Sequence, residues 1–373
     1  MLRRHVATGL AAFGSVAALL GGPSGCSAGV DVGQGSSATT GAGGGAGGSA
    51  MMVTAAGTGG GGAGGGTGGS EPSACVPFDG AVLAVDKLYL GGRTFDDKES
   101  SVAWKDFGFN LDNLTTTSNF ATHCKPAAGG STSVFEDGSS GRDNSFGRNV
   151  RVILEALVPS LDGQANDAIT AGQFSQIFVF PGLGSSGDAE ALVTKVYGAG
   201  VLGKAPSWNG ADCWPILYEN LLDPKDVGSA KTVYPASTLV KNVWNSNGTS
   251  DMVLTLNVAG QSVPIKIYQA RMAVQLAATH QGGALGHIGG YLKSEEFVQT
   301  LRAVSGAINK AACQLFDGGV ADQLRRASDL LDDGTQDPTK TCNAISVGLG
   351  FTLRQVALGP SLPKTAEPID YCK

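Results

Sequence analysis

Residues 252–276 read MVLTLNVAGQSVPIKIYQARMAVQL, and this stretch is the strongest indication of the fold class. Leu254, Leu256 and Val258 alternate with polar residues, and the alternation returns in two further runs, at 263–267 and 272–276. A period of two is typical of strands with one buried face. Because Ala259-Gly260 offers a turn, the stretch predicts a three-stranded antiparallel meander.

Other periodic runs flank this meander. Strand-like runs lie at 82–85, 88–90, 174–180 and 345–353. Helical spacing appears at 147–158, at 165–171, after Ser294, and in a segment that carries Val320, Leu324, Ala327 and Leu331. The sequence therefore predicts an α+β fold, mainly antiparallel and sandwich-like, with three or four peripheral helices.

The helix expected at 147–158 has the clearest apolar face. Its apolar residues recur at helical spacing and continue past Pro159, which should end it: Val150, Ile153, Leu154, Leu157, Val158 and Leu161. Asp143, Asn144 and Ser145 offer caps at its start.

Cys26 marks a change in composition near the start of the chain. Arg3 and Arg4 precede an apolar stretch at 6–20, which is shorter than a membrane span and fits a signal peptide. Ser24-Gly25-Cys26 matches a bacterial lipoprotein signal, whereas Pro23 stands where Leu is expected. The alternative is an ordinary secretory cleavage with an incidental cysteine. We expect a signal peptide at 1–25 and lipidation of Cys26.

The segment 26–74 is rich in Gly, Ala, Ser and Thr and holds only two charged residues, Asp31 and Glu71. Such a composition buries too little apolar surface to order the chain, so we expect a disordered tether. Residues 75–373 then form the globular domain. Removal of Arg3 and Arg4 changes the formal charge from −6 to −8, which argues against nucleic-acid binding.

Six cysteines lie beyond the tether, and an even number in an exported chain predicts three disulfides. They are Cys75, Cys124, Cys213, Cys313, Cys342 and Cys372. Cys313 with Cys342, and Cys75 with Cys372, are the expected pairs. A mixture of disulfides and buried free thiols is the alternative.

Residues 329–337 read DLLDDGTQD and gather carboxylates around an Asp-Gly turn. Calcium prefers such oxygen ligands, so calcium is the one cofactor that the sequence suggests. The candidate ligands are Asp329, Asp332, Asp333 and Asp337. Leu331 and Lys340 depart from the EF-hand pattern, which leaves a solvated turn as the alternative. A second Asp-rich turn, at 137–144, fits helix capping as well as calcium.

Two tryptophans lie close to polar residues in the segment 207–214. Trp208, Asn209, Asp212 and Trp214 are the residue types that hold sugar rings, and packing beneath a loop is the alternative. The glycines at 182–187 match a dinucleotide fingerprint without its helix, so we expect a loop there. His280 and His287 bracket a Gly-rich segment, also expected to be a loop.

The leader and tether, together with residues 143–149, 208–212 and 328–351, resemble uncharacterised surface lipoproteins of the myxobacterial type. This resemblance implies a habitat and no activity. The sequence thus predicts a non-catalytic, lipid-anchored protein of the bacterial outer membrane or cell surface that binds a ligand or serves structure. The alternative is a carbohydrate-binding or glycoside-active surface protein. Expected partners are the membrane, a glycan or an envelope protein.

Overall fold

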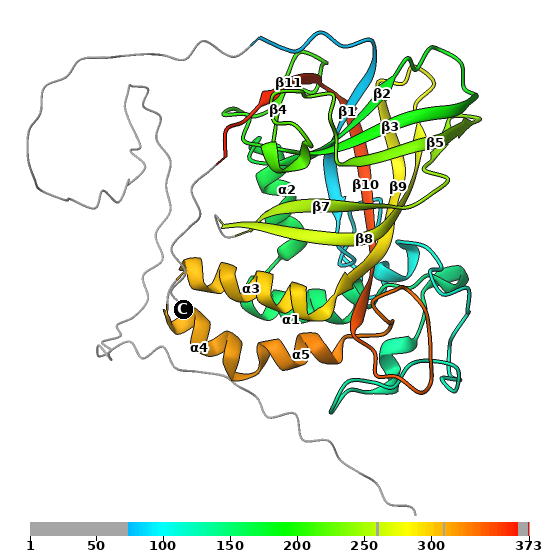
Figure 1. The fold of residues 1–373 in the computed structure, drawn as a ribbon, viewed down its shortest axis with the longest axis vertical. Helices are drawn as coiled ribbons and strands as arrows, with labels where there is room; N and C mark the ends of the chain where they lie inside the picture. The colour runs from blue at the N-terminus through cyan, green and yellow to red at the C-terminus, as the bar shows by residue number, and fades with distance from the viewer. Residues whose placement is uncertain (1–73, 259–260, 309, 365–371, 373) are drawn as a thin grey trace, which may run out of the picture. The chain divides into compact units, whose positions relative to one another are not determined.

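The computed structural model describes residues 74–258, 261–308, 310–364 and 372. Cys26, the leader and nearly all of the tether lie outside these residues. Figure 1 shows the arrangement of the elements. The strands are β1 (Gly80–Tyr89), β2 (Ser175–Pro181), β3 (Ala189–Ala199), β4 (Cys213–Ile216), β5 (Thr232–Val240), β6 (Val243–Asn245), β7 (Ser250–Val258), β8 (Gln261–Leu276), β9 (Gly282–Lys293), β10 (Ala344–Gln355) and β11 (Ala357–Ser361).

The helices lie on one side of the strands in Figure 1, apart from α2. They are α1 (Arg151–Leu157), α2 (Leu161–Thr170), α3 (Ser294–Ile308), α4 (Lys310–Leu315) and α5 (Ala321–Arg326). A π-helical turn, η4 (Phe146–Val150), leads into α1, and another, η6 (Phe316–Val320), joins α4 to α5. The short 3-10 turns are η1 (Ala103–Asp106), η2 (Thr132–Phe135), η3 (Ser139–Gly141) and η5 (Tyr218–Asn220).

The strands form one large sheet that closes on itself. Pairing runs β3-β2-β1-β10-β9-β8-β6-β5, and β5 pairs again with β3. β7 pairs with β8, and β4 and β11 extend the sheet beyond β3. Between named strands of the described chain, only β11 and β4 run parallel. The expected α+β, mainly antiparallel and sandwich-like fold is confirmed.

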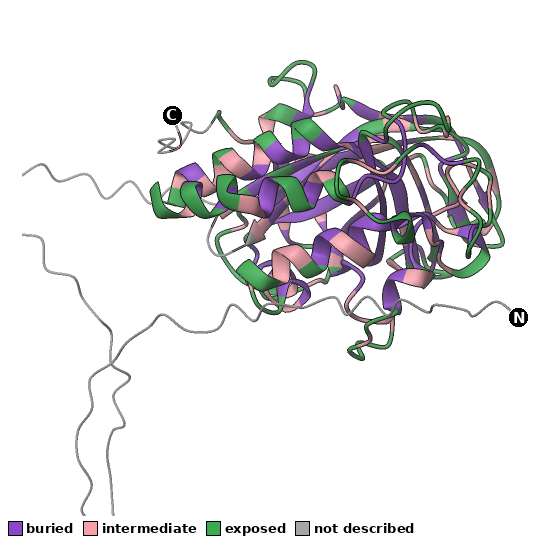
Figure 2. Ribbon diagram, turned by 90° about the horizontal axis from the view of Figure 1, so that it is seen from below, coloured by how far each residue is buried: buried purple, intermediate pink, exposed green. Residues whose placement is uncertain are grey.

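The main core lies between the opposed parts of this sheet and continues beneath the helices. Phe178 stacks on Phe351 with a ring-centroid distance of 5.3 Å, and Trp244 meets Phe178 and Phe180 edge-on. All four rings are fully buried. Figure 2 shows that buried residues lie mostly on the strands inside, whereas the outer sides of the helices are exposed. Alternation along each strand therefore directs one set of side chains inward.

The predicted meander is wrong in its strand count. Residues 263–267 and 272–276 belong to one strand, β8, whose first half pairs with β7 and whose second half pairs with β6 and β9. Residues 268–271 hold neither Gly nor Pro, so no tight turn forms there. The strand instead bends at Gln269, where φ is 46°, and the register with β9 shifts between Tyr268 and Arg271.

The Gly-rich segment that was expected to be a loop is strand β9. Its glycines allow close packing rather than chain reversal. A Cβ at Gly286 would lie 2.6 Å from the Phe351 ring, and one at Gly289 would lie 2.7 Å from Phe109. Larger side chains at these positions would collide with the neighbouring layer.

The predicted helices are present, with shifted ends. The helix expected at 147–158 is η4 followed by α1, which ends at Leu157 before Pro159. α2 begins four residues earlier than expected, at Leu161. α3 begins at Ser294 as expected, whereas α5 ends at Arg326 and leaves Leu331 in a loop.

Three disulfides are present, but the two expected pairings are wrong. The bonds join Cys75 to Cys213, Cys124 to Cys342 and Cys313 to Cys372. The first pairing was expected because Cys313 and Cys342 are close along the chain. In the structure, backbone hydrogen bonds between Lys125 and the segment before β10 bring Cys342 next to Cys124 instead. Cys75 precedes β1 and lies next to β4 because Val76 donates to Leu358 in β11, which pairs with β4.

No helix among the described residues combines the length and the apolar character needed to cross a membrane.

Candidate functional site

An apolar cavity of about 290 Å³ lies between the helices and the β7–β8 hairpin. Leu256, Val263 and Ile265 of the hairpin form one wall. The helical side is formed by residues of α1, the start of α2, α3, α4 and η6, namely Leu154, Leu157, Val158, Leu161, Leu301, Val304, Ser305, Ile308, Ala312, Leu315, Phe316 and Val320. Gln261 completes the lining. Two polar residues among sixteen make the lining almost purely apolar.

The cavity forms because the apolar faces of two helical segments, 150–161 and α3, do not pack directly against each other. The apolar stripe at 150–161 packs its first residues into the core, since Val150 is fully buried. Its later residues, Leu154, Leu157 and Val158, line the cavity instead. α3 presents a second stripe across the gap. The space between the stripes remains unfilled by side chains of the described chain.

Exposure increases from the inner end of the cavity to its rim. Leu161, Leu256, Ile265 and Phe316 are at most 4% exposed. On the rim, Leu157, Ile308 and Leu315 are 41%, 48% and 60% exposed. Three large aliphatic side chains that line the cavity therefore also face water.

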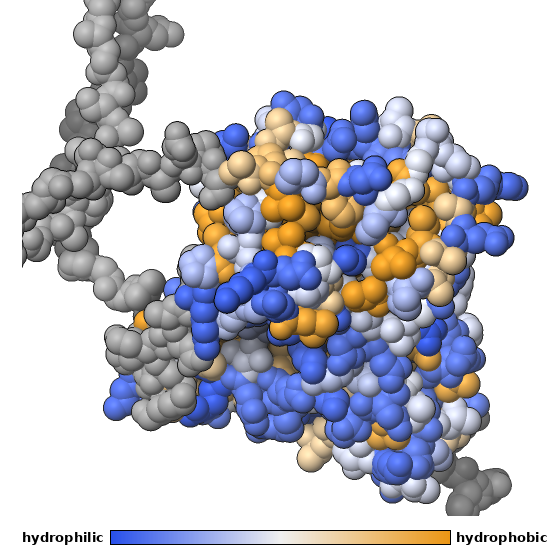
Figure 3. Space-filling model, turned by 45° about the horizontal axis from the view of Figure 1, so that its top comes forward, coloured by the Kyte–Doolittle hydropathy of each residue, from blue (hydrophilic) through white to orange (hydrophobic). Residues whose placement is uncertain are grey.

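Apolar side chains also reach the surface elsewhere. In Figure 3 they gather in the upper half of the face that is shown, whereas polar side chains dominate its lower half. Val193, Val240 and Val243, on β3, β5 and β6, are exposed. None of these lines the cavity, and scattered exposed apolar residues are common on protein surfaces.

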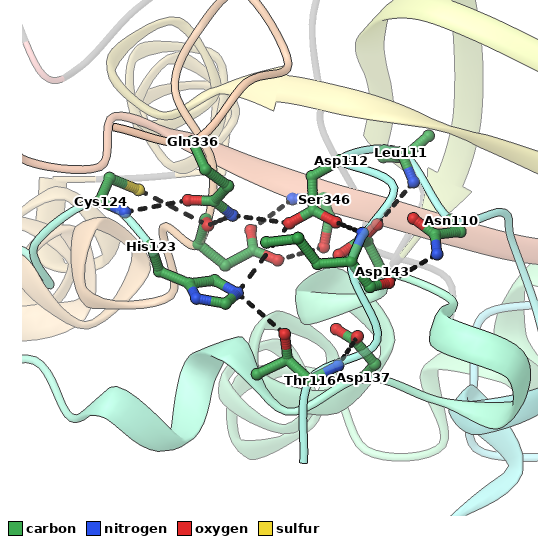
Figure 4. A network of polar contacts seen from close by, with 12 residues as sticks. Asn110, Leu111, Asp112, Thr116, His123, Cys124, Asp137, Asp143, Gln336 and Ser346 are labelled. Carbon is green, nitrogen blue, oxygen red and sulfur yellow. Dashed lines mark hydrogen bonds and ion pairs between the residues drawn. The ribbon is translucent and has the colours of Figure 1, made fainter. Parts of the chain in front are cut away.

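A second feature is a buried cluster of four aspartates beside the start of β10 (Figure 4). Asp112, Asp137 and Asp143 come from the segment between β1 and α1, whereas Asp329 comes from the loop before β10. The charges of the other three act on Asp143. Burial and this mutual repulsion raise the pKa of Asp143 well above its usual range. Burial raises the pKa of Asp137 to about 6 and that of Asp329 to about 7.

Each carboxylate of the cluster accepts hydrogen bonds from the chain itself. Asp143 Oδ2 accepts from Leu111 N at 2.6 Å, and Asp112 accepts from Leu114 N and Gln336 Nε2, both at 2.9 Å. Asp329 accepts from Ser346 N at 2.7 Å and from its hydroxyl. Thr116 N donates to Asp137. These bonds hold three loops against β10.

His123 lies at the edge of the cluster. Its Nε2 is 3.0 Å from Thr116 Oγ1 and 4.0 Å from Asp112 Oδ2. Burial lowers the pKa of His123, so the ring is neutral at pH 7. Because Thr116 and Asp112 approach the same ring nitrogen, the three residues do not form a proton relay of the catalytic type.

The structure separates the four residues expected to bind calcium. Asp329 is buried in the cluster, whereas Asp333 is exposed and Asp337 is half-buried, each in a turn. Each of these two accepts from the backbone N–H and the hydroxyl of the threonine two residues later, Thr335 and Thr339. Asp332 is also exposed. Within the described ranges, no three His, Cys, Asp or Glu side chains are close enough to hold a metal ion.

Of the four residues expected to bind sugar, Trp208, Asn209 and Asp212 lie in the loop before β4, and Trp214 lies on β4 itself. Trp214 is fully buried and donates from Nε1 to Gly200 O at 2.7 Å. Trp208 is half-buried, and its ring centroid is 5.4 Å from that of Trp214. Asp212 is buried and accepts from Ser207 N and Trp208 N, while Asn209 is exposed. The carboxylate and the Trp214 ring are thus engaged within the protein.

The two histidines expected to bracket a loop lie apart from both features. His280 Nδ1 is 2.8 Å from Gly184 O, in the loop that carries the dinucleotide-like glycines. His287 lies on β9 against Phe95 and Phe109, and burial together with the Arg142 charge lowers its pKa to about 4.

No protein-family model, curated protein or solved structure matches this chain. The cavity was not predicted from the sequence. The apolar stripe that continues past Pro159 to Leu161 contains the lining residues from that part of the chain. The sequence does not show that α3, α4 and β7–β8 pack opposite this stripe and complete the cavity.

Proposed function

We propose that this protein is a lipid-anchored protein of the bacterial cell surface whose globular domain binds an apolar ligand without catalysis. The observation that carries the proposal is the apolar cavity with its exposed aliphatic rim. Ligand sites are concave, mostly apolar and largely preformed, and the volume of this cavity, about 290 Å³, lies just below their usual range of about 300–1,000 Å³.

The non-catalytic assignment is supported by the cavity lining. Ser305 is its one hydroxyl residue, and Ser305 Oγ donates to Leu301 O at 2.9 Å. Gln261 is the other polar residue, and an amide is neither an acid nor a base near neutral pH. The lining therefore offers burial rather than acid–base chemistry.

The location rests on the sequence alone. The apolar leader and Ser24-Gly25-Cys26 support lipidation at Cys26, and the uncharged tether supports display away from the membrane. Replacement Cys26→Ser should release the protein into the soluble fraction. Retention of this variant in the membrane fraction would contradict the anchor.

Ligand binding is tested with N-phenylnaphthylamine, an uncharged probe that fluoresces in apolar surroundings. Ala312 lines the cavity on α4, so Ala312→Trp should fill it and weaken probe binding about tenfold. The matched control is Ala311→Trp, because Ala311 is exposed on the same helix and does not line the cavity.

Far-UV circular dichroism checks that both variants fold. If Ala312→Trp is unfolded, Leu315→Gln at the rim takes its place. Equal probe affinities in the cavity variant and the control would contradict the proposal.

A further inference from the structure

We propose that the ligand of this cavity is an uncharged single-chain lipid with a hydroxyl end, a long-chain alcohol. Its hydrocarbon chain lies beside β8, and its hydroxyl group hydrogen-bonds to the amide of Gln261. The inference rests on the proposed function and adds the class of ligand and its orientation.

The β8 wall of the cavity changes from polar to apolar along the strand. Gln261, Val263 and Ile265 alternate along β8, and all three line the cavity. Gln261 is half-buried, whereas Val263 and Ile265 are 6% and 4% exposed. At about 3.3 Å per residue, the positions of Gln261 and Ile265 are roughly 13 Å apart. A hydrocarbon chain that lies beside β8 therefore passes from a partly exposed amide to buried aliphatic side chains.

Helix α3 shows the same change in exposure on its side of the cavity. Leu301 is 9% exposed, and Ile308, about two turns later, is 48% exposed. Both residues line the cavity. In Figure 1, α3 ends on the same side of the molecule as the start of β8. The more exposed ends of the two walls thus lie on one side, where a ligand keeps its polar end near water.

The amide of Gln261 is the lining group best suited to bind this polar end. Within the described ranges, no hydrogen bond engages its side chain. Ser305, the other polar lining residue, donates its hydroxyl proton to Leu301 O and can therefore only accept from a ligand. An amide both donates and accepts, and so does a hydroxyl group. A hydroxyl end thus matches Gln261 more fully than a carbonyl, which only accepts.

The lining favours an uncharged ligand. None of the sixteen lining residues is charged. On the helical elements that contribute to it, Arg302 pairs with Asp317 and Arg151 pairs with Glu155. An ionised end group placed beside Gln261 would lose water and gain no opposite charge from the lining, which costs far more than burial of a hydrogen-bonded hydroxyl.

The cavity volume favours one hydrocarbon chain over two. About 290 Å³ is just below the usual range of ligand pockets, about 300–1,000 Å³. A single chain therefore suits the cavity better than the paired chains of a phospholipid.

The test uses the full chain with Cys26→Ser, so that neither an attached lipid nor a detergent competes for the cavity. Decan-1-ol and 1-chlorodecane are titrated below their aggregation limits, with displacement of N-phenylnaphthylamine as the signal. Gln261→Leu should weaken decan-1-ol about fivefold and leave 1-chlorodecane unchanged, because only the alcohol hydrogen-bonds to the amide. Gln281→Leu, at an exposed glutamine outside the cavity, should change neither affinity.

Two further ligands test the charge. Decanoate and decyltrimethylammonium have chains of the same length, and both should bind at least about tenfold more weakly than decan-1-ol. Retained binding of 1-chlorodecane shows that Gln261→Leu is folded, and Gln261→Met replaces it if it is not.

The outcomes separate this inference from the proposed function. An unchanged affinity for decan-1-ol in Gln261→Leu, or a loss in Ser305→Ala instead, would overturn the orientation. Either ion binding as tightly as the alcohol would overturn the uncharged class. Binding of 1-chlorodecane that Ala312→Trp abolishes, with no binding of decan-1-ol, would overturn the alcohol and keep the apolar site. Binding of phospholipid vesicles alone would overturn the single chain. If no probe binds, the inference and the proposed function both fail.

Discussion

The apolar cavity and the buried aspartate cluster use their side chains in opposite ways. In the cluster, each of the four carboxylates accepts at least one hydrogen bond from the chain itself. In the cavity, aliphatic side chains surround space that the described chain leaves empty. Acidic residues suggest a ligand site more readily than leucines do. Here the acidic residues hold loops of the fold together, and the leucines line the cavity for which we propose a ligand.

If this contrast holds, removal of polar groups around the cluster should destabilise the protein most. Asn144 is buried next to the cluster and makes four hydrogen bonds, from Nδ2 to Trp104 O and Gly348 O and to Oδ1 from Gly147 N and Gly348 N. Asn144→Ala leaves these backbone groups unpaired. We expect a loss of about 4 kcal/mol in the free energy of unfolding, measured by urea titration.

The control for this variant is Asn245→Ala. Asn245 is exposed, and its side chain accepts one hydrogen bond, from Asn247 N. We expect a change below about 1 kcal/mol. Equal losses in the two variants would mean that the cluster region contributes no more to stability than an exposed turn does.

The cluster should also make stability depend on pH. Burial raises the pKa of Asp329 to about 7, above its value in the unfolded chain. The native state therefore binds this proton more tightly, and the stability that it contributes is present at low pH and is lost as pH rises through 7. Asp329→Asn cannot ionise. Its stability relative to the natural chain should improve by about 3 kcal/mol between pH 4.5 and pH 8.

The comparison between the two chains matters because other groups titrate in the opposite direction. Burial lowers the pKa of His287 to about 4, so its contribution is lost as pH falls. The contribution of His287 to the free energy of unfolding is the same in the natural chain and in Asp329→Asn, so it cancels when the two stabilities are subtracted. A difference that stays constant with pH would show that Asp329 keeps one protonation state throughout.

Local patterns predicted the helices and part of the strands, but they missed β4, β5, β6, β9 and β11 and could not show which segments meet. The alternation at 252–276 identified strand residues correctly, yet the sequence does not reveal that a strand bends at Gln269 without a turn. Glycines on β9 suggested a loop because their role depends on Phe351 and Phe109, which come from elsewhere in the chain.

The candidate sites show the same limit. Asp329 was singled out as a metal ligand, while its burial and its bonds to Ser346 depend on the position of β10. Asp112 and the cavity were not anticipated. The stripe at 150–161 was interpreted as the apolar face of a helix, and only its packing against α3 and β7–β8 separates the buried residues from those that line the cavity.

The smallest expected effect on stability concerns the rim. Leu315 is 60% exposed and lines the opening, so Leu315→Gln removes apolar surface that already faces water. We expect a change within about 0.5 kcal/mol in the free energy of unfolding, together with a several-fold loss in affinity for N-phenylnaphthylamine. Leu222→Gln is the matched control, because Leu222 is 74% exposed and lies outside the cavity. A large loss of stability with unchanged binding would make Leu315 part of the core and would reverse the roles assigned to the two regions.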